Sequence, residues 1–398
     1  MQNNQSKIEK LISELCPNGV KFKILGELED LEIIKLGRGD VISKTDLSTI
    51  TGNYPVYSSS SVNSGEFGKY GKYMFDDERI SWSIDGGGRF FYRPAHKYSV
   101  TNVSGWLKVI KTDVLNTRYL YFVLSNAWAT KFFDYTKKAH PSIIRNEYNI
   151  PVPPLAIQEE IVKILDNFTE LEAELEAELE ARKKQYEYYR EKMLTFGNNV
   201  NSNTLREISS LITKGTTPSS FEKSGVSFIK TESFDGVRIN KSKLSYVKES
   251  IHKNELKRSM LQEGDILFTI AGATIGKCAI VTNDILPANT NQALAIIRLS
   301  EKVNKKYIFH LLQSRLMKNY IQLSAKGSAQ PNLNLQQINN FSFPLPPLTE
   351  QNRIVTILDK FDALVNDISI GLPAELKARR QQYEYYRNKL LTFKEYAG

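Results

Sequence analysis

A glycine-rich segment at residues 272–278 reads Gly-Ala-Thr-Ile-Gly-Lys-Cys and is similar to a phosphate-binding loop. Such a loop has one more residue between its glycines, and a Ser or Thr after the lysine to hold magnesium. Here Cys278 takes that place, which argues against nucleotide binding. The first half has Asp-Gly-Gly-Gly-Arg at residues 85–89, in the corresponding place. A glycine turn followed by a basic residue in both halves predicts a shared hairpin. It is either a structural turn alone or a turn that presents Arg89 and Lys277 to DNA.

A polar loop at residues 326–334, with its counterpart at 137–142, carries side chains suited to DNA. Asn and Gln can form paired hydrogen bonds with adenine, and Lys can contact phosphate. The alternative is an ordinary connection between a helix and a strand. Four basic residues elsewhere are further candidates, although an exposed lysine is often merely solvated. The predicted DNA-binding residues are Arg38, Lys44, Arg89, Lys137, Lys138, His140, Lys214, Lys230, Lys277, Lys326, Gln330, Asn332 and Asn334.

Signatures of catalysis and of metal binding are missing from the sequence. There is no Asn/Asp-Pro-Pro-Tyr/Phe motif, and Pro153-Pro154-Leu155 lacks the polar and aromatic residues that hold a flipped base. Two cysteines and four histidines offer no disulfide framework and little for a metal site. We therefore predict a chain that is not an enzyme and binds no cofactor or metal itself. Two rival interpretations remain, a stand-alone methyltransferase or restriction-enzyme fragment and a coiled-coil scaffold that binds no DNA.

The charge of the chain is unevenly distributed. The total is +9, but residues 1–150 carry +4, residues 151–196 carry −5, residues 197–343 carry +9 and residues 344–398 carry +1. A positively charged surface favours a polyanionic partner such as nucleic acid. No stretch approaches the 18 apolar residues of a membrane span, and the N-terminus lacks the features of a signal peptide. We expect a cytoplasmic protein whose DNA-binding surface lies on residues 1–150 and 197–343.

An internal duplication organises the sequence. Residues 151–168 match residues 344–361 at 11 of 18 positions, and residues 181–196 match residues 378–393 at 12 of 16 positions. Two matched blocks in the same order identify two copies of one unit. Each copy consists of a variable globular part followed by a similar helical segment.

The helical segments carry apolar residues at steps of three and four, which predicts a heptad seam. We expect the first helix to run without interruption over about 40 residues, or roughly 60 Å. Pro373 predicts a kink or restart in the second helix. Two such stripes in one chain most simply bury each other as an intramolecular coiled coil. The globular parts are expected to be α/β, with strands in 73–84, 261–270 and 334–344, a helix in 299–323, and an N-terminal helix at 6–15 that packs on the long helices.

These features resemble the specificity subunit of type I restriction–modification enzymes. The resemblance rests on duplicated variable domains, each closed by Pro-x-Pro-Pro-Leu and a long helix, and on residues 371–387 and 15–20. It implies an α+β fold in which two α/β target-recognition domains are separated by two long antiparallel helices with pseudo-two-fold symmetry. The expected boundaries are 1–27 for an N-terminal helical arm, 28–155 and 198–348 for the recognition domains, and 156–197 and 349–398 for the spacer and docking helices.

The resemblance also implies a function and a set of partners. The chain is expected to be non-catalytic and to read a bipartite double-stranded DNA target, one half with each domain. Two modification (methyltransferase) subunits, which bind S-adenosylmethionine, are expected to dock on it, and restriction subunits join that core. Residues 170–181 repeat Glu-Leu-Glu-Ala three times. Each repeat adds about 6 Å of helix, so we expect one repeat more or less to change the DNA spacer by about one to two base pairs.

Overall fold

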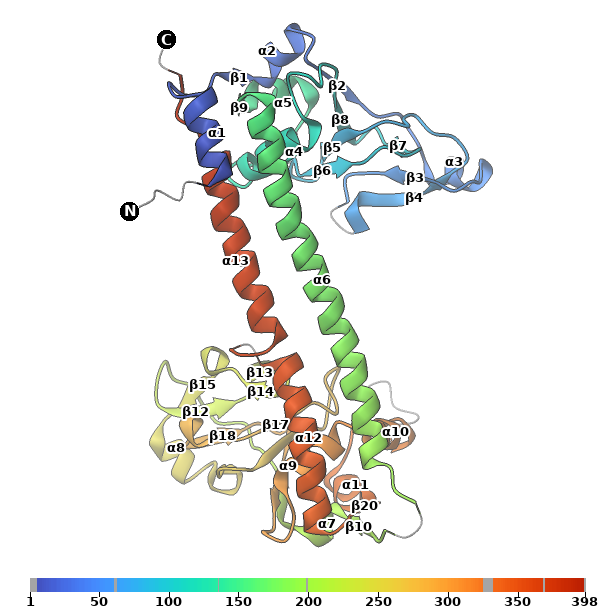
Figure 1. Ribbon diagram of the computed structural model, residues 1–398. Coiled ribbons are helices and arrows are strands. Elements are labelled where there is room, and N and C mark those ends of the chain that lie inside the picture. Colours follow the sequence, from blue (N-terminus) through green and yellow to red (C-terminus); the bar gives the residue numbers. More distant parts are fainter. Residues whose placement is uncertain are drawn as a thin grey trace. The chain divides into compact units, whose positions relative to one another are not determined.

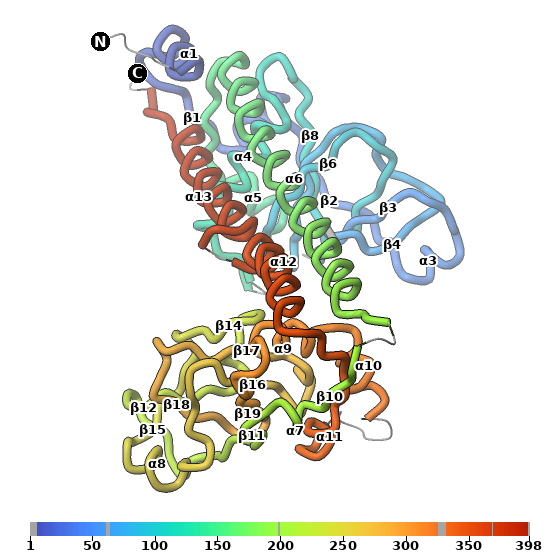
Figure 2. The backbone as a smooth tube through the Cα atoms, turned by 60° about the horizontal axis from the view of Figure 1, so that its bottom comes forward, coloured from blue at the N-terminus to red at the C-terminus, as the bar shows by residue number. Residues whose placement is uncertain are grey.

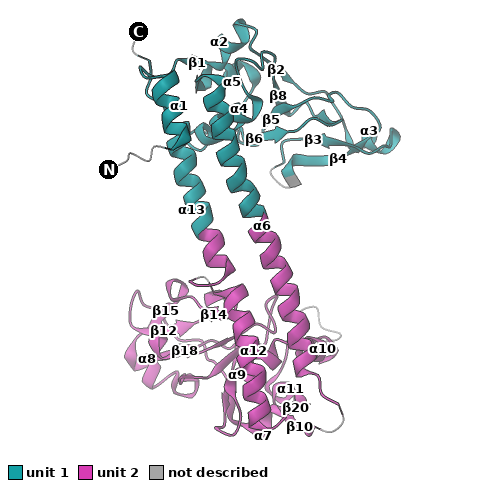
Figure 3. Ribbon diagram, in the orientation of Figure 1, with its two compact units in different colours: residues 1–173, 378–398 teal, residues 174–377 magenta. Residues whose placement is uncertain are grey.

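The computed structural model describes residues 6–60, 63–134, 136–197, 200–324, 332–367 and 369–396. The chain divides into two compact units, which are coloured separately in Figure 3. Unit 1 comprises Met1–Ala173 and Ala378–Gly398, and unit 2 comprises Glu174–Lys377. The last segment of the chain therefore belongs to the same unit as the first.

Unit 1 is built on an antiparallel sheet with the strand order β2-β8-β5-β6. A smaller sheet has the order β4-β3-β7, and β1 pairs with β9 where the chain enters and leaves the globular part. The strands are β1 (Phe22–Ile24), β2 (Ile34–Arg38), β3 (Tyr54–Tyr57), β4 (Glu66–Tyr70), β5 (Arg79–Ser83), β6 (Phe90–Arg93), β7 (Ser99–Val100), β8 (Ser104–Val109) and β9 (Asn149–Pro151).

Unit 2 repeats the topology of these three sheets and adds a two-stranded sheet, β13-β14. Its larger sheet has the order β11-β19-β16-β17, its smaller sheet β15-β12-β18, and β10 pairs with β20. The strands are β10 (Ser202–Thr204), β11 (Ser209–Lys214), β12 (Val226–Ile229), β13 (Phe234–Asp235), β14 (Arg238–Ile239), β15 (Ser245–Val247), β16 (Ile266–Thr269), β17 (Cys278–Ile280), β18 (Ala288–Thr290), β19 (Leu294–Leu299) and β20 (Ser342–Pro344).

Helices pack around the sheets of each unit (Figure 1). Those of unit 1 are α1 (Lys7–Leu15), α2 (Leu25–Asp30), α3 (Lys44–Thr49), η1 (Asn63–Gly65), α4 (Thr117–Trp128) and α5 (Pro141–Glu147). Those of unit 2 are α7 (Leu205–Ile208), η2 (Thr231–Ser233), η3 (Lys241–Lys243), α8 (Glu249–Lys253), η4 (Lys257–Ser259), η5 (Asn283–Ile285), α9 (Lys305–Leu312), α10 (Arg315–Ser324), α11 (Leu335–Asn340) and α12 (Leu348–Asn366). The helices α6 (Leu155–Leu194) and α13 (Leu372–Leu391) contribute to both units.

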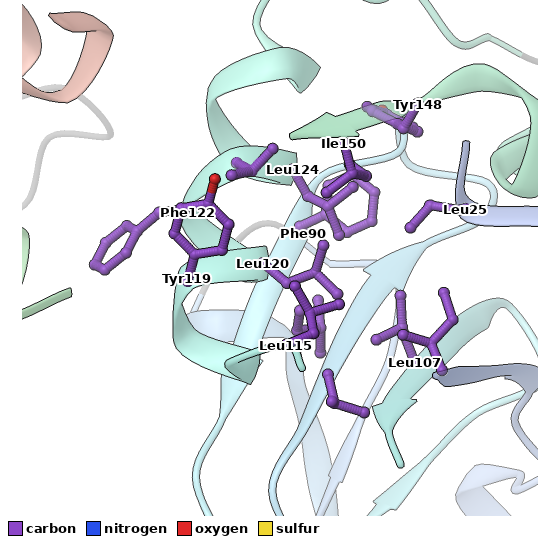
Figure 4. Close-up of a cluster of buried hydrophobic side chains, with 14 of the residues drawn as sticks. Leu25, Phe90, Leu107, Leu115, Tyr119, Leu120, Phe122, Leu124, Tyr148 and Ile150 are labelled. Atoms are coloured by element: carbon purple, nitrogen blue, oxygen red, sulfur yellow. The ribbon is translucent and has the colours of Figure 1, made fainter. Parts of the chain in front are cut away.

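The core of unit 1 lies between the larger sheet and the helices α2, α4 and α5. Figure 4 shows Phe90 and Leu107 of the sheet facing Leu120 of α4, with Tyr148 and Ile150 closing the cluster. Alternate residues of β8 point into this core, as expected for a strand with one buried face. Burial of these side chains fixes the register of the sheet, and with it the position of each strand end.

The long helices pair in an antiparallel manner within each unit. In unit 1 the ring of Phe168 on α6 lies 5.6 Å from the ring of Tyr386 on α13. In unit 2 the equivalent ring of Phe361 on α12 lies 5.4 Å from that of Tyr189 on α6. Figure 2 shows both helix pairs as neighbouring tubes. The repeated sequence blocks thus make the same aromatic contact twice, each time between different copies of the repeat.

Several helix predictions are confirmed. The first long helix, α6, is continuous, whereas the second ends at Asn366 and restarts at Leu372, directly before Pro373. The N-terminal helix α1 shares the core of unit 1 with Leu390 of α13. The seam differs from a uniform coiled coil, because Ile157 is fully buried but Leu171 is 44% exposed. Burial near Ile157 comes largely from the globular core, which does not extend along the helix.

Some predicted elements are wrong. Residues 334–344 form the helix α11 followed by the short strand β20, because Asn334 caps a helix there. The predicted strand at 73–84 is confined to β5, and the one at 261–270 to β16. The segment 299–323, which was predicted to be helical, begins at the end of β19 and then forms the two helices α9 and α10, and this prediction is therefore largely confirmed.

Candidate nucleic-acid interface

The structure brings three of the predicted DNA-binding residues of unit 1 to one edge of its larger sheet. Because the strands are antiparallel, the ends of β2 and β5 lie at the same edge as the starts of β8 and β6. Arg38 ends β2, and Arg89 directly precedes β6. Lys138 joins them because the next residue, Ala139, donates its N–H to Ile84 O at 3.1 Å. We call Arg38, Arg89 and Lys138 edge 1.

Each residue of edge 1 is held in a defined contact. The Arg38 Nε donates to the carbonyl of Asn102 in the turn before β8. The Arg89 guanidinium lies 5.5 Å from the centre of the Phe91 ring and is exposed. Lys138 Nζ forms an ion pair with Asp85 at 2.9 Å. The side chains are therefore oriented at the edge, and half of the Lys138 surface remains open to a ligand.

The remaining candidates of unit 1 lie near edge 1 or away from it. Lys137 pairs with Glu147 at 3.0 Å, and His140 Nδ1 lies 3.0 Å from Ser142 Oγ at the start of α5. Both flank Lys138 along the chain. Lys44 is the exposed first residue of α3, which packs against the smaller sheet, so it does not belong to edge 1.

Unit 2 gathers its candidates in the same way. Lys214 ends β11, and Lys277 directly precedes β17, so both lie at one edge of the larger sheet. Asn332 joins them through a bridge to Ala271, and Leu333 donates its N–H to Ile270 O at 2.8 Å. We call Lys214, Lys277 and Asn332 edge 2. All three side chains are exposed.

The other candidates of unit 2 have different positions. Asn334 is exposed, and its Oδ1 caps α11 by accepting from Gln337 N at 2.8 Å. Lys230 follows β12 and lies 4.3 Å from the centre of the Phe221 ring. The predicted residues Lys326 and Gln330 lie outside the described residues.

The hydrogen-bond pattern fixes the alignment of the two copies. The sequence pairs the loop at residues 137–142 with the loop at residues 326–334 but does not fix the register between them. In the structure, His140 and Asn334 each stand at the N-cap of the equivalent helix, α5 and α11. Ala139 and Leu333, one residue earlier, bond to equivalent strand ends. Lys138 therefore corresponds to Asn332, and His140 to Asn334.

The glycine segments form hairpin turns, as predicted. Gly87 and Gly88 connect β5 to β6 with φ of +85° and +76°, and Gly272 and Gly276 adopt +82° and +89° between β16 and β17. L-residues rarely adopt such angles, so the turn requires glycine. A phosphate-binding loop would lead into a helix, but here strand β17 follows with Cys278 buried. The segment is therefore not a nucleotide-binding loop.

A second pair of glycines, next to the two edges, allows the larger sheet of each unit to approach the smaller sheet closely. An added Cβ on Gly39 would lie 2.2 Å from Val100 O, and one on Gly215 would lie 2.1 Å from Thr290 O. These glycines directly follow Arg38 and Lys214. The close approach joins the larger sheet to the smaller one and fixes the basic residue before it.

Sequence reasoning missed one equivalent pair at the edges, Asn102 and Gln292. Each lies two residues before the strand β8 or β19, in the segment that leads into that strand. Asn102 O accepts from Arg38, and Gln292 Oε1 accepts from Thr217 Oγ1. Amide side chains can read adenine. No signal marked them, because the two copies share too little sequence there to be aligned.

Other kinds of site are not found in the described part of the chain. No group of three or more His, Cys, Asp or Glu side chains there could hold a metal ion. Among the same residues, no helix combines the length and the apolar character needed to cross a bilayer.

Comparison with known families shows that the two edges lie in two copies of the same kind of domain. Residues 19–181 and 198–378 each match the family model described as the type I restriction modification DNA specificity domain. Edge 1 lies in the first match, and the described residues of edge 2 lie in the second. The chain belongs to the family of type I restriction–modification specificity subunits.

Relatives support this membership along the whole chain. The EcoR124I/EcoR124II specificity subunit of Escherichia coli is 33% identical over 288 residues, covering 69% of this chain and 70% of that protein. A putative type I restriction enzyme specificity subunit of Haemophilus influenzae is 32% identical over 419 aligned positions, covering 99% and 100%. The crystal structure of a specificity subunit from M. genitalium has 17% identity and a TM-score of 0.57, covering 94% and 96%, and so shares the fold.

Family membership removes one rival interpretation. Specificity subunits are recognition components and are not catalytic, so this chain is not a stand-alone methyltransferase. In this specificity subunit, the repeat units seen in the sequence coincide with the two matched domains. The duplicated topology and the family agree that the chain holds two recognition domains.

Proposed function

We propose that this specificity subunit reads a bipartite double-stranded DNA target, one half-site with edge 1 and the other with edge 2. The observation that carries the proposal is the equivalence of the two edges. Two unlike sequences build the same strand ends, the same glycine turn and the same close approach, and both place basic residues there. A coiled-coil scaffold that binds no DNA does not require basic residues at equivalent strand ends in two domains.

The chemistry of the edges divides into two roles. Arg38 and Lys214 are basic at equivalent positions, as are Arg89 and Lys277. Residues that are basic in both units suit phosphates, which are the same at every DNA sequence. Side chains that differ between the units suit base edges, because base contacts carry the sequence information. The differing pairs are Lys138 with Asn332, His140 with Asn334, and Asn102 with Gln292.

The partners of the proposed complex are two modification subunits, which supply S-adenosylmethionine and methylate the DNA, and restriction subunits. The repeated helix ends offer two equivalent surfaces for one kind of partner. Tyr188 and Tyr385 hold the same place in the two repeats and are 60% and 64% exposed. Large exposed aromatic side chains are favoured as interface anchors. We assign one modification subunit to each tyrosine.

The docking assignment is tested by native mass spectrometry of complexes with the modification subunit. Tyr188→Ala or Tyr385→Ala alone should reduce the bound copies from two to one, and the double variant should bind none. Tyr73→Ala, which removes another exposed tyrosine of unit 1, serves as the control. Full occupancy in the double variant would reject the assignment.

The spacing role of residues 170–181 is part of the same proposal. Adding one Glu-Leu-Glu-Ala repeat to α6 should lengthen the spacer by about one to two base pairs and leave both half-sites unchanged. Methylation mapping of this variant measures the spacer directly. An unchanged spacer would show that the helix does not set the distance.

DNA binding itself is tested by titrating the purified chain, alone and with its modification subunit, against a DNA duplex that carries the target sequence found by methylation mapping. Affinity should fall with salt, because phosphate contacts release counterions. Binding that is absent or independent of salt would contradict the proposal.

A further inference from the structure

Unit 1 contains a cleft that the edges do not account for. It lies between β6, α4 and the paired helices α6 and α13, with a volume of about 420 Å³. Three arginines line it, and so do several aromatic rings. We call it the arginine cleft, after Arg89, Arg93 and Arg118.

Arg93 is the unusual residue of the arginine cleft. It is only 4% exposed. Its Nε donates to Ser81 Oγ at 2.9 Å and its Nη2 to Ser64 O at 2.8 Å, while its guanidinium lies 3.6 Å from the centre of the Tyr57 ring. Among the described residues, no carboxylate lies within ion-pair distance of it. Burial lowers its pKa to about 10. A buried cation without a counter-charge is costly, so the cleft favours an anion from outside.

The other charges of the cleft leave it positive. Arg89 is exposed and, within the described part of the chain, has no carboxylate partner. Arg118 pairs with Asp166 at 2.7 Å and lies over Tyr92. The acidic lining residue, Glu172, is bound to Arg380 at 2.6 Å. Two arginines therefore face the cleft without neutralisation.

The equivalent cleft of unit 2, of about 500 Å³, has the opposite character. Lys306, in the place of Arg118, and His310 both contact Asp359. Arg238 pairs with Asp367 at 2.7 Å. Asp362, in the place of Thr169, also lines this cleft. Its basic groups Arg238, Lys306 and His310 thus have carboxylate partners within the chain, whereas Arg89 and Arg93 of the arginine cleft have none among the described residues.

We propose that the arginine cleft binds the phosphate group of a nucleotide through Arg93 and Arg89. Guanidinium groups match phosphate oxygens in geometry and charge. The rings of Phe91 and Tyr121 line the same cleft and suit stacking with a base. The nucleotide is either free in solution or part of a bound DNA strand. This proposal does not rest on DNA recognition by the edges.

The test uses the full chain and isothermal titration calorimetry with AMP and with inorganic phosphate. AMP should bind more tightly than phosphate. Thr169→Asp copies the acidic residue of unit 2 into the arginine cleft and should weaken AMP binding by about tenfold or more. Thr169→Asn is the neutral control and should leave AMP binding within about twofold.

Arg93→Gln should abolish AMP binding, with its folding checked by circular dichroism. Since Arg93 is buried, Thr169→Asp keeps the proposal testable if this variant does not fold. No AMP binding by the unaltered chain, AMP binding no tighter than that of phosphate, or equal binding by Thr169→Asp would each overturn the proposal. A short duplex that displaces AMP identifies a DNA nucleotide as the ligand, and simultaneous binding identifies a free nucleotide; either result supports the site. Loss of AMP binding without any change in half-site recognition leaves the proposal for the edges intact.

Discussion

Edge 1 and edge 2 share a backbone but not a surface. The strand ends, the glycine turns and the close approach of Gly39 and Gly215 are the same in both units. Arg38 and Lys214 keep a positive charge in equivalent places, whereas Lys138 in one unit is Asn332 in the other. A common backbone can keep its phosphate contacts in both units, while different side chains at other positions contact different bases. Under the proposed function, affinity and sequence selectivity therefore depend on different residues.

The largest expected difference between the units concerns their stability. Asp265 in unit 2 is 1% exposed and accepts from Arg298 at 2.8 Å, while Asp77 in unit 1, with 29% side-chain exposure, contacts Lys108 at 2.6 Å. Asp265→Asn should lower the free energy of unfolding by about 3 kcal/mol, since it leaves a guanidinium without its buried partner. Asp77→Asn should cost less, about 1–2 kcal/mol, because the carboxylate of Asp77 is partly solvated, although Arg79, which also binds it at 2.6 Å, is largely buried.

Denaturant unfolding measures both values, with the exposed Asp113→Asn as the control. Equal losses for the Asp77 and Asp265 variants would show that burial does not distinguish the two ion pairs.

The next prediction concerns the close contact of Gly39 and Gly215 with a backbone carbonyl of the smaller sheet. Gly39→Ala and Gly215→Ala each force a methyl group against a backbone carbonyl and should destabilise the chain by about 1–3 kcal/mol. Gly197→Ala is the matched control, because an added Cβ there meets nothing within 4 Å. The same unfolding experiment serves, and a neutral Gly215→Ala variant would mean that the edges do not depend on this contact.

Selectivity should change in one half-site at a time. Replacing Lys138 and His140 by Asn gives unit 1 the side chains that unit 2 has at these positions, Asn332 and Asn334, and should alter the half-site read by unit 1. Each altered base contact is worth about 1–3 kcal/mol of discrimination. Sequencing of methylated sites measures both halves together, and unaltered recognition by this double variant would remove these residues from base reading.

The basic residues common to both edges should act uniformly on all sequences. Lys214→Gln and Lys277→Gln should each reduce the slope of log affinity against log salt by about 1, with little change in the preferred sequence. Lys302→Gln is the control, since Lys302 follows β19 at the opposite end of that strand. A change in preferred sequence without a change in slope would reverse the assigned roles.

A small dependence of the free energy of unfolding on pH, at acidic pH, should distinguish the units further. Burial raises the pKa of Asp77, but hydrogen bonds from Arg79 and Lys108 outweigh it and hold the pKa below its usual value. Its contribution to stability is therefore complete above the unfolded pKa of about 3.9 and is lost as the pH falls through the depressed value. Unfolding of Asp77→Asn should depend less on pH below about 4 than that of the unaltered chain. Identical pH profiles would contradict this.

The repeated blocks made the helices and the duplication predictable, because heptad spacing and Pro373 act locally. The position of Arg89 and Lys277 after a glycine turn was predictable for the same reason, since a glycine turn is a local signal. The sequence did not predict which residues come together at edge 1 and edge 2. They arise from strand register, which joins Arg38 to Asn102 across the sheet, and register is set by burial in the core. Arg93 reads in sequence as an ordinary basic residue, and only its burial makes it notable.

The central claim is that each unit reads one half of a bipartite target. The most direct test is sequencing of the methylated sites of a host that expresses this chain with its modification subunit. The unaltered chain should give two half-sites around a fixed spacer, the Lys138 and His140 variant should change one half, and Asn332→Lys should change the other. A continuous target, or a change in both halves from a variant of one unit, would contradict the claim.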